Sequence, residues 1–378
     1  MKITFYSNFL NHHQLPFCLE LNKRLGDNFK FVATTPISQE CLAIGYEDSN
    51  KKYPFVLTTY DNQQNEIEAM RLAAESDVII HGSAPEKYIK KRIKNGKLTF
   101  RYSERAFKRG RKHILNPKRI GGMLLHHTYF SRKNVYMLCA SAYTAGDMAM
   151  VGAYLGRTFK WGYFPEAKSY NLDEMFSQKS EKPLLLWCGR FLKLKHPEKA
   201  VLVAERLKQE GYDFDLQMLG AGEEQERIKK MIEEKKVEDR VSLLGSVPAK
   251  QVREYMEKAN IFLFTSDQNE GWGAVLNESM NSGCAVVASK AIGSVPFLMQ
   301  DGENGLVYED KDFEDLYRKV KFLMDNPEKR DEYGKNAYKT MTENWSAEVA
   351  AERIIELAKQ LPNKNAFKDG PCSRAKLM

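Results

Sequence analysis

The chain is poor in cysteine and has no long apolar run. Its six cysteines are scattered over 378 residues without a C-x-x-C pair, which argues against a disulfide framework. Nowhere do about 18 apolar residues follow one another, and the N-terminal MKITFYSNFL lacks the apolar core of a signal peptide. We therefore expect a globular protein of a reducing compartment, cytoplasmic or at most peripheral on the inner membrane face.

Positive charge is concentrated in one segment. Residues 86–133 contain 16 Lys and Arg against two acidic residues, in a chain whose net charge is +8, so the remainder is net acidic. The segment includes KKRIKNGK and ERAFKRGRKH, in which apolar residues interrupt the charges. Two interpretations stay open: a solvated charged face, or a surface that contacts anionic lipid or phosphate.

Length and patterning indicate two domains. Short β-rich runs alternate with helical patterns, first up to about residue 165 and again from LLLWCG onward, which predicts parallel sheets covered by helices. We expect two Rossmann-like, doubly wound α/β domains that face each other across a cleft, residues 1–165 and 184–343, joined by a linker over 166–183. A helix over 344–361 is expected to cross back to the first domain, and the polar tail 362–378 to be disordered.

The stretch EGWGAVLNE is the first candidate site. It follows the apolar run IFLFT, so it lies at the carboxyl end of a predicted strand, and a helix is expected to begin near Gly273 or Ala274. The N–H groups of a helix start favour an anion, and Gly271 leaves room for one. Glu270 and Glu278 flank this spot. Because carboxylates repel phosphate, they suit the neutral hydroxyl groups of a sugar or ribose.

Cations to balance a phosphate occur after the first strand of the second half, in LLLWCGRFLKLKHPEKA. Arg190 follows the strand directly, and Lys195 precedes a helix opened by Pro197. An Arg fork and a Lys point charge together could clamp a diphosphate, although a lone loop cation is more often only solvated.

Metal and dinucleotide sites are weakly supported. The D-x-D pattern at 213–215 leads into a strand, so a strand entry is the better interpretation. The adjacent histidine pairs at 12–13 and 126–127 cannot readily turn to one ion. The G-x-G at 220–222 lacks the third glycine of a dinucleotide site and is better interpreted as a turn beside the site. We predict no metal and no cofactor.

Taken together, CGRFLKLKH, LQMLGAGEEQERIKK, VSLLGSVP and TSDQNEGWGAVLNESMNSGCAVVASKAIGSVPFLMQDGENGLVY resemble the carboxy-terminal domain of GT-B retaining glycosyltransferases of family 4, or glycosyltransferase group 1. The resemblance covers nearly all of residues 184–308. It implies a GT-B fold and transfer of a sugar, with retention, from a nucleoside-diphosphate donor to a hydroxyl of a glycan or lipid-linked acceptor, in surface polysaccharide or glycoconjugate synthesis.

The resemblance also implies residue roles. Arg190 and Lys195 would hold the diphosphate, Glu270 would contact the transferred sugar, and Glu278 would bind the ribose hydroxyls. Further donor contacts are implied for the backbone of the glycine turn and for a loop that meets the base: Gly271, Trp272, Gly273 and Ala274 in the turn, Ser246 and Val247 in the loop.

The chain departs from the family in two places. Residues 293–297 read GSVPF where an acidic residue is usual, which leaves the local helix cap unexplained. The histidine usual in the amino-terminal domain is not obvious, because LTFRYSER offers Ser103 and Glu104 in its place. The candidates in this half are therefore weak, and they are Asn8, His12, His13 and Glu104.

Several mechanisms and functions stay open at this point. The departing phosphate can itself take the acceptor's proton, and a double displacement through Glu270 is an alternative. The same scaffold supports a sugar-nucleotide epimerase or another GT-B enzyme. From another class, the basic segment 86–133 could make the protein a membrane- or nucleic-acid-binding module, although its aromatic residues form no stacking platform for nucleic acid.

Overall fold

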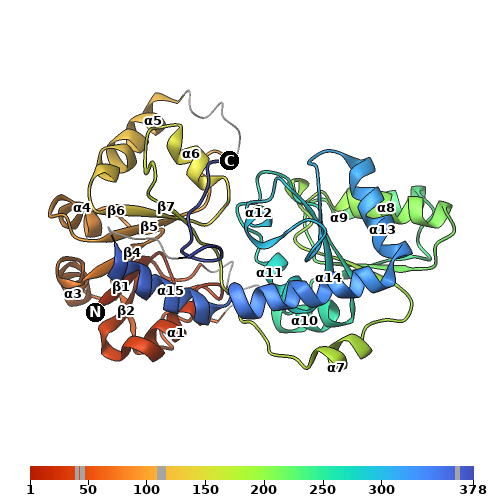
Figure 1. Ribbon diagram of the computed structural model, residues 1–378, viewed down its shortest axis with the longest axis horizontal. Coiled ribbons are helices and arrows are strands. Elements are labelled where there is room, and N and C mark those ends of the chain that lie inside the picture. The colour runs from red at the N-terminus through yellow and green to blue at the C-terminus, as the bar shows by residue number, and fades with distance from the viewer. Residues whose placement is uncertain (39–41, 43–46, 109–115, 362–366) are drawn as a thin grey trace. The chain divides into compact units, whose positions relative to one another are not determined.

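The structure, a computed structural model, describes residues 1–38, 42, 47–108, 116–361 and 367–378 (Figure 1). The chain folds into two compact units. Unit 1 comprises Met1–Glu166 and Trp345–Met378, and unit 2 comprises Ala167–Asn344. Each unit is an α/β structure built on its own parallel sheet. The alternation of strand and helix patterns along the sequence therefore corresponds to two separately folded sheets.

Unit 1 contains a seven-stranded parallel sheet of order β3-β2-β1-β4-β5-β6-β7. Its strands are β1 (Ile3–Ser7), β2 (Phe29–Ala33), β3 (Val56–Thr58), β4 (Val78–His81), β5 (Thr99–Ser103), β6 (Val135–Cys139) and β7 (Thr158–Lys160). Its helices are α1 (Leu15–Leu25), α3 (Gln63–Glu75), α4 (Lys87–Lys94), α5 (Pro117–Met123), α6 (Thr144–Ala149) and α15 (Ala347–Gln360). The central strands are buried on both faces, which explains their continuous apolar runs.

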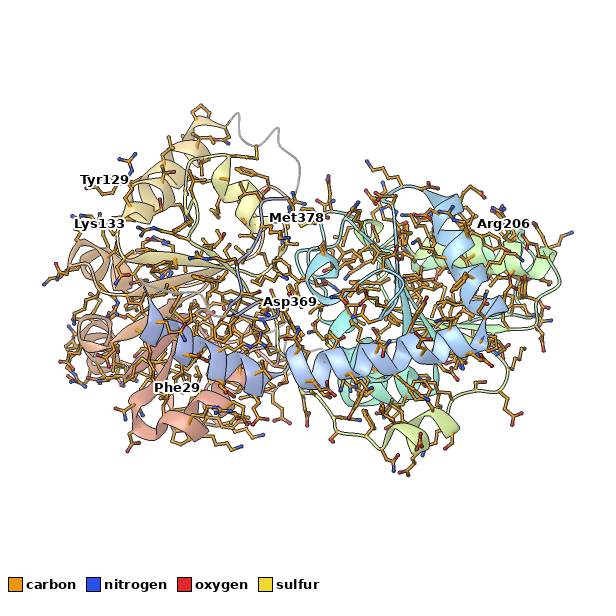
Figure 2. All side chains as sticks on the ribbon, viewed as in Figure 1. Phe29, Tyr129, Lys133, Arg206, Asp369 and Met378 are labelled. Carbon is orange, nitrogen blue, oxygen red and sulfur yellow. The ribbon has the colours of Figure 1, made fainter. Side chains whose placement is uncertain are left out.

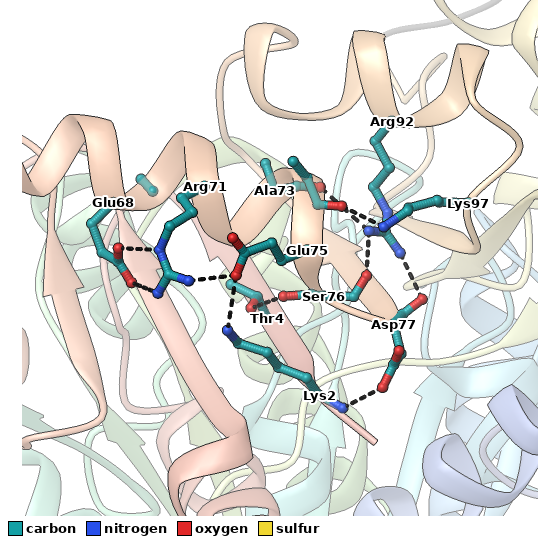
Figure 3. Close-up of polar contacts among 12 residues, drawn as sticks. Lys2, Thr4, Glu68, Arg71, Ala73, Glu75, Ser76, Asp77, Arg92 and Lys97 are labelled. Carbon is teal, nitrogen blue, oxygen red and sulfur yellow. Dashed lines mark hydrogen bonds and ion pairs between the residues drawn. The ribbon is translucent and has the colours of Figure 1, made fainter.

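Part of the positive charge in unit 1 is structural. Arg92, on α4, is buried and donates to four backbone carbonyl groups, among them those of Ser76 at 2.5 Å and Asp77 at 2.7 Å (Figure 3). Three of the four carbonyls belong to the last turn of α3 or directly follow it, where a helix leaves its last C=O groups without partners, and the fourth, that of Leu98, precedes β5. Arg92 therefore satisfies the end of α3 and is not available to a ligand.

The C-terminal helix α15 belongs to unit 1, where it packs against α1. Ser346 caps its start by accepting a hydrogen bond from the N–H of Val349 at 3.2 Å. Arg24 of α1 lies 3.4 Å from a carboxylate oxygen of Glu348. Just before the helix, the Trp345 ring stacks on Phe164 with ring centroids 6.1 Å apart.

The end of the chain differs from the expected disordered tail. Residues 362–366 lie outside the described residues, but 367–378 pack against β7, the edge strand of the sheet. Lys160 donates its N–H to the carbonyl of Ser373 at 2.7 Å and accepts from the N–H of Cys372 at 2.8 Å. Cys372 is fully buried, and Arg374 lies over the Phe159 ring. Backbone pairing with an exposed strand edge outweighs the polar composition of this segment.

Unit 2 contains a six-stranded parallel sheet of order β10-β9-β8-β11-β12-β13. Its strands are β8 (Leu184–Cys188), β9 (Asp215–Leu219), β10 (Val241–Gly245), β11 (Ile261–Phe264), β12 (Ala285–Ser289) and β13 (Leu306–Tyr308). Its helices are α7 (Leu172–Ser177), α8 (Pro197–Gln209), α9 (Gln225–Glu234), α10 (Ala249–Lys258), α11 (Val275–Asn281), α12 (Val295–Leu298), α13 (Phe313–Asp325) and α14 (Pro327–Lys339). The order reverses between β8 and β11, which is where doubly wound sheets bind ligands.

The segment 166–183, expected as a linker, packs on unit 2 from residue 167 onward. The backbone N–H and C=O of Lys168 both bond the side-chain amide of Asn281, at 2.8 and 3.0 Å. The ammonium group of Lys179 donates to three backbone carbonyls, including that of Ala259 at 2.7 Å. These hydrogen bonds use polar residues as tertiary contacts, which the composition of the segment does not reveal.

Candidate active site

Two loops leave the carboxyl edge of the unit 2 sheet at the point where the strand order reverses. The loop after β8 carries Arg190 and Lys195, and the loop after β11 carries Glu270 and the glycine turn. They are joined by backbone contacts, since Asp267 donates its N–H to the carbonyl of Leu194 at 2.9 Å. The topology therefore brings together two sequence motifs that lie about 80 residues apart.

Lys195 and Glu270 form an ion pair across these two loops. Their side chains are 17% and 14% exposed, so the pair is largely shielded from solvent. The same Glu270 oxygen accepts a hydrogen bond from the hydroxyl of Ser266 at 3.2 Å. The structure thus places two of the predicted catalytic residues in direct contact.

A buried hydroxyl positions Lys195. Thr265, which follows β11 directly, donates to the carbonyl of Lys195 at 2.7 Å and accepts from the indole N–H of Trp187 at 2.9 Å. Both Thr265 and Trp187 are buried. Reasoning from the sequence missed these residues and Ser266. Their only signal was their place at the carboxyl ends of β8 and β11.

Arg190 provides the unpaired cation of the site. Its side chain is exposed, and it makes no hydrogen bond or ion pair with the part of the chain that the structure describes. Its backbone is fixed by the turn next to it, where Gly220 comes so close to the Gly189 carbonyl that a Cβ would overlap it. Phe191 also donates its N–H to the carbonyl of Ala221 at 2.9 Å. The G-x-G therefore supports the Arg190 loop, as the interpretation of a turn beside the site predicts.

The glycine turn opens α11 at the predicted place, with Ala274 as the cap residue. Gly273 has φ of +79°, and a Cβ there would overlap the Phe264 ring, so only glycine fits. Among the described residues, no acceptor lies within hydrogen-bonding reach of the N–H groups of Gly273, Ala274 and Val275. The turn therefore presents backbone donors that a ligand oxygen can use.

The Trp272 side chain cannot be a ligand contact, because it is fully buried. Its indole N–H donates to the Asn277 side chain at 2.9 Å, and its carbonyl accepts from the hydroxyl of Ser294 at 2.6 Å. Within the turn predicted to bind the donor, Trp272 can therefore contact a ligand only through its backbone atoms. The bond from Ser294 also accounts for the unusual GSVPF sequence, since this hydroxyl fixes the turn and does not cap α12.

Glu278 lies on the first turn of α11, largely shielded from solvent, and its carboxylate makes no hydrogen bond or ion pair with any described residue. Burial raises the pKa of its carboxyl group, and nearby Arg253 partly opposes the rise. Glu278 also acts electrostatically on the thiol of Cys188, at the end of β8. Burial raises the pKa of this thiol to about 12, Glu278 adds to the rise, and Lys195 opposes it. Glu278 and Lys195 therefore both act electrostatically on the thiol at the end of β8.

The remaining predicted residues of unit 2 lie farther along the sheet edge. Ser246 and Val247 follow β10, the outermost strand, two strands away from β8. Their strand is tied to the G-x-G turn, because Gly220 donates its N–H to the Gly245 carbonyl at 2.8 Å. The D-x-D carboxylates are used structurally: Asp213 pairs with Arg240 and Lys182, and Asp215 with Lys182. Across the described residues, no group of three or more His, Cys, Asp or Glu could hold a metal ion.

In unit 1 the structure brings together three of the four weak candidates, because the His12 ring lies against that of His13, with centroids 3.6 Å apart. The His13 ring stacks on Tyr163, with centroids 5.1 Å apart, and the Tyr163 hydroxyl donates to Glu104 at 2.5 Å. Burial lowers the pKa of His13 well below its usual value and that of His12 to about 4, so both rings are neutral at pH 7. The Nδ1 atom of His13 is buried without a hydrogen-bond partner. Tyr163 was missed, because nothing in its sequence context distinguishes it.

Asn8 is not part of this cluster. Its side-chain oxygen accepts from the Ser7 hydroxyl at 3.1 Å, and its carbonyl accepts from the N–H groups of Thr34 and Thr35, each at 2.8 Å. Asn8 therefore joins the ends of β1 and β2.

Over the described ranges, the structure contains no helix that is both long and apolar enough to cross a membrane.

Parts of the chain resemble known proteins. Residues 171–340 match the family model described as Glycosyl transferases group 1. A relative from Rhizobium meliloti, lipopolysaccharide core biosynthesis glycosyltransferase LpsE, is 26% identical over 183 residues, which cover 48% of this chain and 52% of that protein. The poly(glycerol-phosphate) alpha-glucosyltransferase of Bacillus subtilis is 28% identical over 186 residues, which cover 47% of this chain and 27% of that protein. The match thus spans about half of the first relative's length and about a quarter of the second's.

Solved structures share the fold over almost the whole chain. The structure of Anabaena HepE in complex with UDP has a TM-score of 0.69 and 16% identity, and the match covers 96% of this chain and all of that one. Sucrose-phosphate synthase from Thermosynechococcus elongatus has a TM-score of 0.62 and 16% identity, with 96% and 99% covered. The predicted pair of Rossmann-like domains is confirmed. The chain has the GT-B fold of glycosyltransferases, and its residues 171–340 match the group 1 glycosyl transferase model.

Proposed function

We propose that the protein is a retaining glycosyltransferase that moves a sugar from a nucleoside diphosphate to a hydroxyl of a glycan or lipid-linked acceptor. The observation that carries the proposal is Glu278, a shielded carboxylate that has no partner among the described residues and that acts, like Lys195, on the Cys188 thiol at the end of β8. Burial disfavours the charged form of this carboxylate, so it points to a ligand whose hydroxyl groups stabilise that form. The relatives' names support surface-polymer synthesis, and HepE was solved with UDP.

In this proposal the donor lies along the carboxyl edge of the unit 2 sheet. Glu278 accepts from the ribose hydroxyls, and the loop at Ser246 and Val247 meets the base. The diphosphate takes the free guanidinium of Arg190, the ammonium of Lys195 and the N–H groups of the glycine turn, Gly271 to Ala274. The second carboxylate oxygen of Glu270 is directed to hydroxyls of the transferred sugar.

The chemistry follows from these charges. The bond between the anomeric carbon and the diphosphate oxygen breaks, the bond to the acceptor oxygen forms, and the acceptor's proton passes to the departing phosphate. Negative charge builds on the leaving group, where two cations and backbone donors are positioned, and such preorganised donors are usually the largest catalytic contribution. We propose that these two cations stabilise the leaving group without a metal ion or other cofactor. Glu270 is poorly suited as a nucleophile, because Lys195 and Ser266 already engage one of its oxygens.

We assign the acceptor to unit 1, where His13, Tyr163 and Glu104 adjoin one another. The partly exposed Glu104 carboxylate supports a hydrogen bond from an acceptor hydroxyl, whereas the Nδ1 atom of His13 is buried. Asn8 and His12 are assigned no direct role.

Thermal unfolding with nucleoside-diphosphate hexoses, UDP-glucose first, tests the donor assignment. A ligand that binds only the folded protein at 100 times its Kd adds about 2.7 kcal/mol of stability, which raises the midpoint. Arg190→Ala should abolish the rise. Lys193→Ala is a matched control, because Lys193 is an equally exposed cation on the same loop. A shift that survives Arg190→Ala contradicts the assignment, and epimerised donor formed without acceptor would indicate an epimerase.

A further inference from the structure

An outward-facing apolar cluster lies on the helical segment 117–133 of unit 1. Leu124, Leu125 and Tyr129 are 45%, 58% and 63% exposed, whereas Met123 and Phe130 of the same segment are buried. Leu125 and Tyr129 are four residues apart, the spacing that places side chains on one helical face. The cluster falls on a π-helical turn, Leu124–Thr128, an irregularity frequent at functional sites.

The inner side of this turn is fixed to the fold, so its apolar side chains are held outward. Buried Arg101 donates to the carbonyl of His126 at 2.8 Å and pairs with both carboxylate oxygens of Glu86. The His127 Nδ1 lies 3.1 Å from the Tyr154 hydroxyl, which gives this histidine a structural role. These contacts hold the segment on its inner face, and Leu124, Leu125 and Tyr129 stay exposed among the described residues.

The neighbouring loop before β7 extends the apolar surface. The Thr128 hydroxyl donates to the carbonyl of Val151 at 2.5 Å, and Arg157 donates to the carbonyl of Lys133, so both ends of the loop are tied to the segment. Leu155, on this loop, is 62% exposed. Four large apolar side chains thus lie exposed on two segments that contact each other.

Cations border the cluster. Residues 117–133 contain no acidic residue. Lys118, Arg132 and Lys133 are exposed and make no ion pair with any described residue, in contrast to the buried Arg92 and the paired Arg101. Figure 2 shows Tyr129 and Lys133 projecting from the same side of unit 1. The surface combines exposed leucines with unneutralised positive charge.

We propose that the 117–133 surface docks on an anionic phospholipid bilayer. Leu124, Leu125 and Tyr129 enter the boundary between headgroups and acyl chains, and Lys118, Arg132 and Lys133 contact lipid phosphates. An apolar face bordered by Lys and Arg is the composition that binds such an interface. A nucleic acid suits the surface less well, because leucines gain nothing from a sugar-phosphate backbone and Tyr129 is the sole exposed aromatic residue among the described residues of the segment.

Vesicle co-sedimentation tests the proposal. The full chain is mixed with vesicles of phosphatidylcholine alone, or with vesicles that also contain roughly 30% phosphatidylglycerol and therefore have an anionic surface. We expect binding to the anionic vesicles that weakens between 0.1 and 1 M salt, because the screening length falls from about 10 to 3 Å. The double variant Arg132→Gln, Lys133→Gln should bind the anionic vesicles roughly 25-fold more weakly, because each lost charge weakens binding about fivefold.

The apolar contribution is tested separately with Leu124→Ser, Leu125→Ser and Tyr129→Ser combined, which should weaken binding on the order of tenfold. Ile67→Ser controls for loss of an exposed apolar side chain elsewhere in unit 1, and Lys229→Gln with Lys230→Gln controls for loss of two exposed cations in unit 2. Both controls should bind as the wild type does. The altered side chains are exposed, so unchanged unfolding midpoints will show that the variants are folded.

Three results would overturn the proposal: equal binding to neutral and anionic vesicles, full binding by the apolar triple variant, or binding to a single-stranded oligonucleotide without binding to vesicles. No nucleotide sugar is present in these assays. Their failure would therefore leave the donor assignment untouched, and failure of the donor assignment would leave vesicle binding unchanged.

Discussion

Replacing Glu278 by Gln should stabilise the unliganded protein and abolish donor binding. The carboxylate is largely shielded and has no partner among the described residues. Burial penalises the charge of Glu278, and the neutral amide of Gln carries no such charge; the penalty for a desolvated group is about 1–3 kcal/mol. Because Glu278 is partly exposed, we take the lower end, about 1 kcal/mol, which corresponds to a rise of about 2–4 °C in the midpoint of a unit of this size.

The effect should depend on pH. Burial raises the pKa of Glu278 above its ordinary value of 4.5, so the folded protein binds a proton more readily than the unfolded chain. The penalty is therefore absent below pH 4.5, grows as pH rises through the raised pKa, and is complete above it. The stability gain of Glu278→Gln should be present at pH 7 and vanish at pH 4.

Calorimetry of the wild type, Glu278→Gln and the exposed control Glu238→Gln at both pH values measures this gain, and repeating the scans with UDP-glucose measures binding. Glu238→Gln should leave both midpoint and binding unchanged. A lower midpoint for Glu278→Gln without ligand would refute the reasoning, because it would mean that the carboxylate has a stabilising partner in the free protein.

Three further changes test contacts that hold the site and the fold in place. Thr265→Val should lower kcat/KM about tenfold by releasing the Lys195 carbonyl, and Thr265→Ser should restore it, as steady-state kinetics will show. Gly273→Ala should abolish donor-induced stabilisation in thermal scans, because its Cβ overlaps the Phe264 ring and must displace the turn. Deleting residues 367–378 should lower the unfolding midpoint measured by circular dichroism, because β7 loses its backbone partners; an unchanged midpoint would contradict this.

Strand and helix patterns were sufficient to predict the doubly wound sheets, because buried parallel strands need continuous apolar runs. The same logic predicted the start of α11, since Gly273 follows a strand end and precedes a helical pattern. What patterns missed were polar tertiary contacts. Asn281 and Lys179 are ordinary surface residues by sequence, yet Asn281 binds the backbone of the expected linker, and Lys179 of that linker binds the backbone of unit 2.

The sequence was sufficient to predict the charged residues of the candidate site, but not the ion pairs that they form. The order of Arg190, Lys195, Glu270 and Glu278 along the chain indicates which residues share a sheet edge. It does not indicate which of them contact one another, because that depends on loop paths set by bonds such as Thr265 to the Lys195 carbonyl. The sequence could likewise not separate the fully buried Trp272 side chain from its available backbone.

The Lys195–Glu270 pair joins two roles that the sequence assigns separately, leaving-group stabilisation and sugar recognition. If the two residues act as one unit, their contributions should not add. Removing either partner leaves the other charge uncompensated in a shielded place, whereas removing both leaves none. In a double-mutant cycle, Lys195→Met and Glu270→Gln should each lower the free energy of unfolding of the free protein. The loss in the double variant should be smaller than the sum of the two single losses by about 0.5–3 kcal/mol. Additive losses in denaturant unfolding would instead show that the two side chains serve the donor independently.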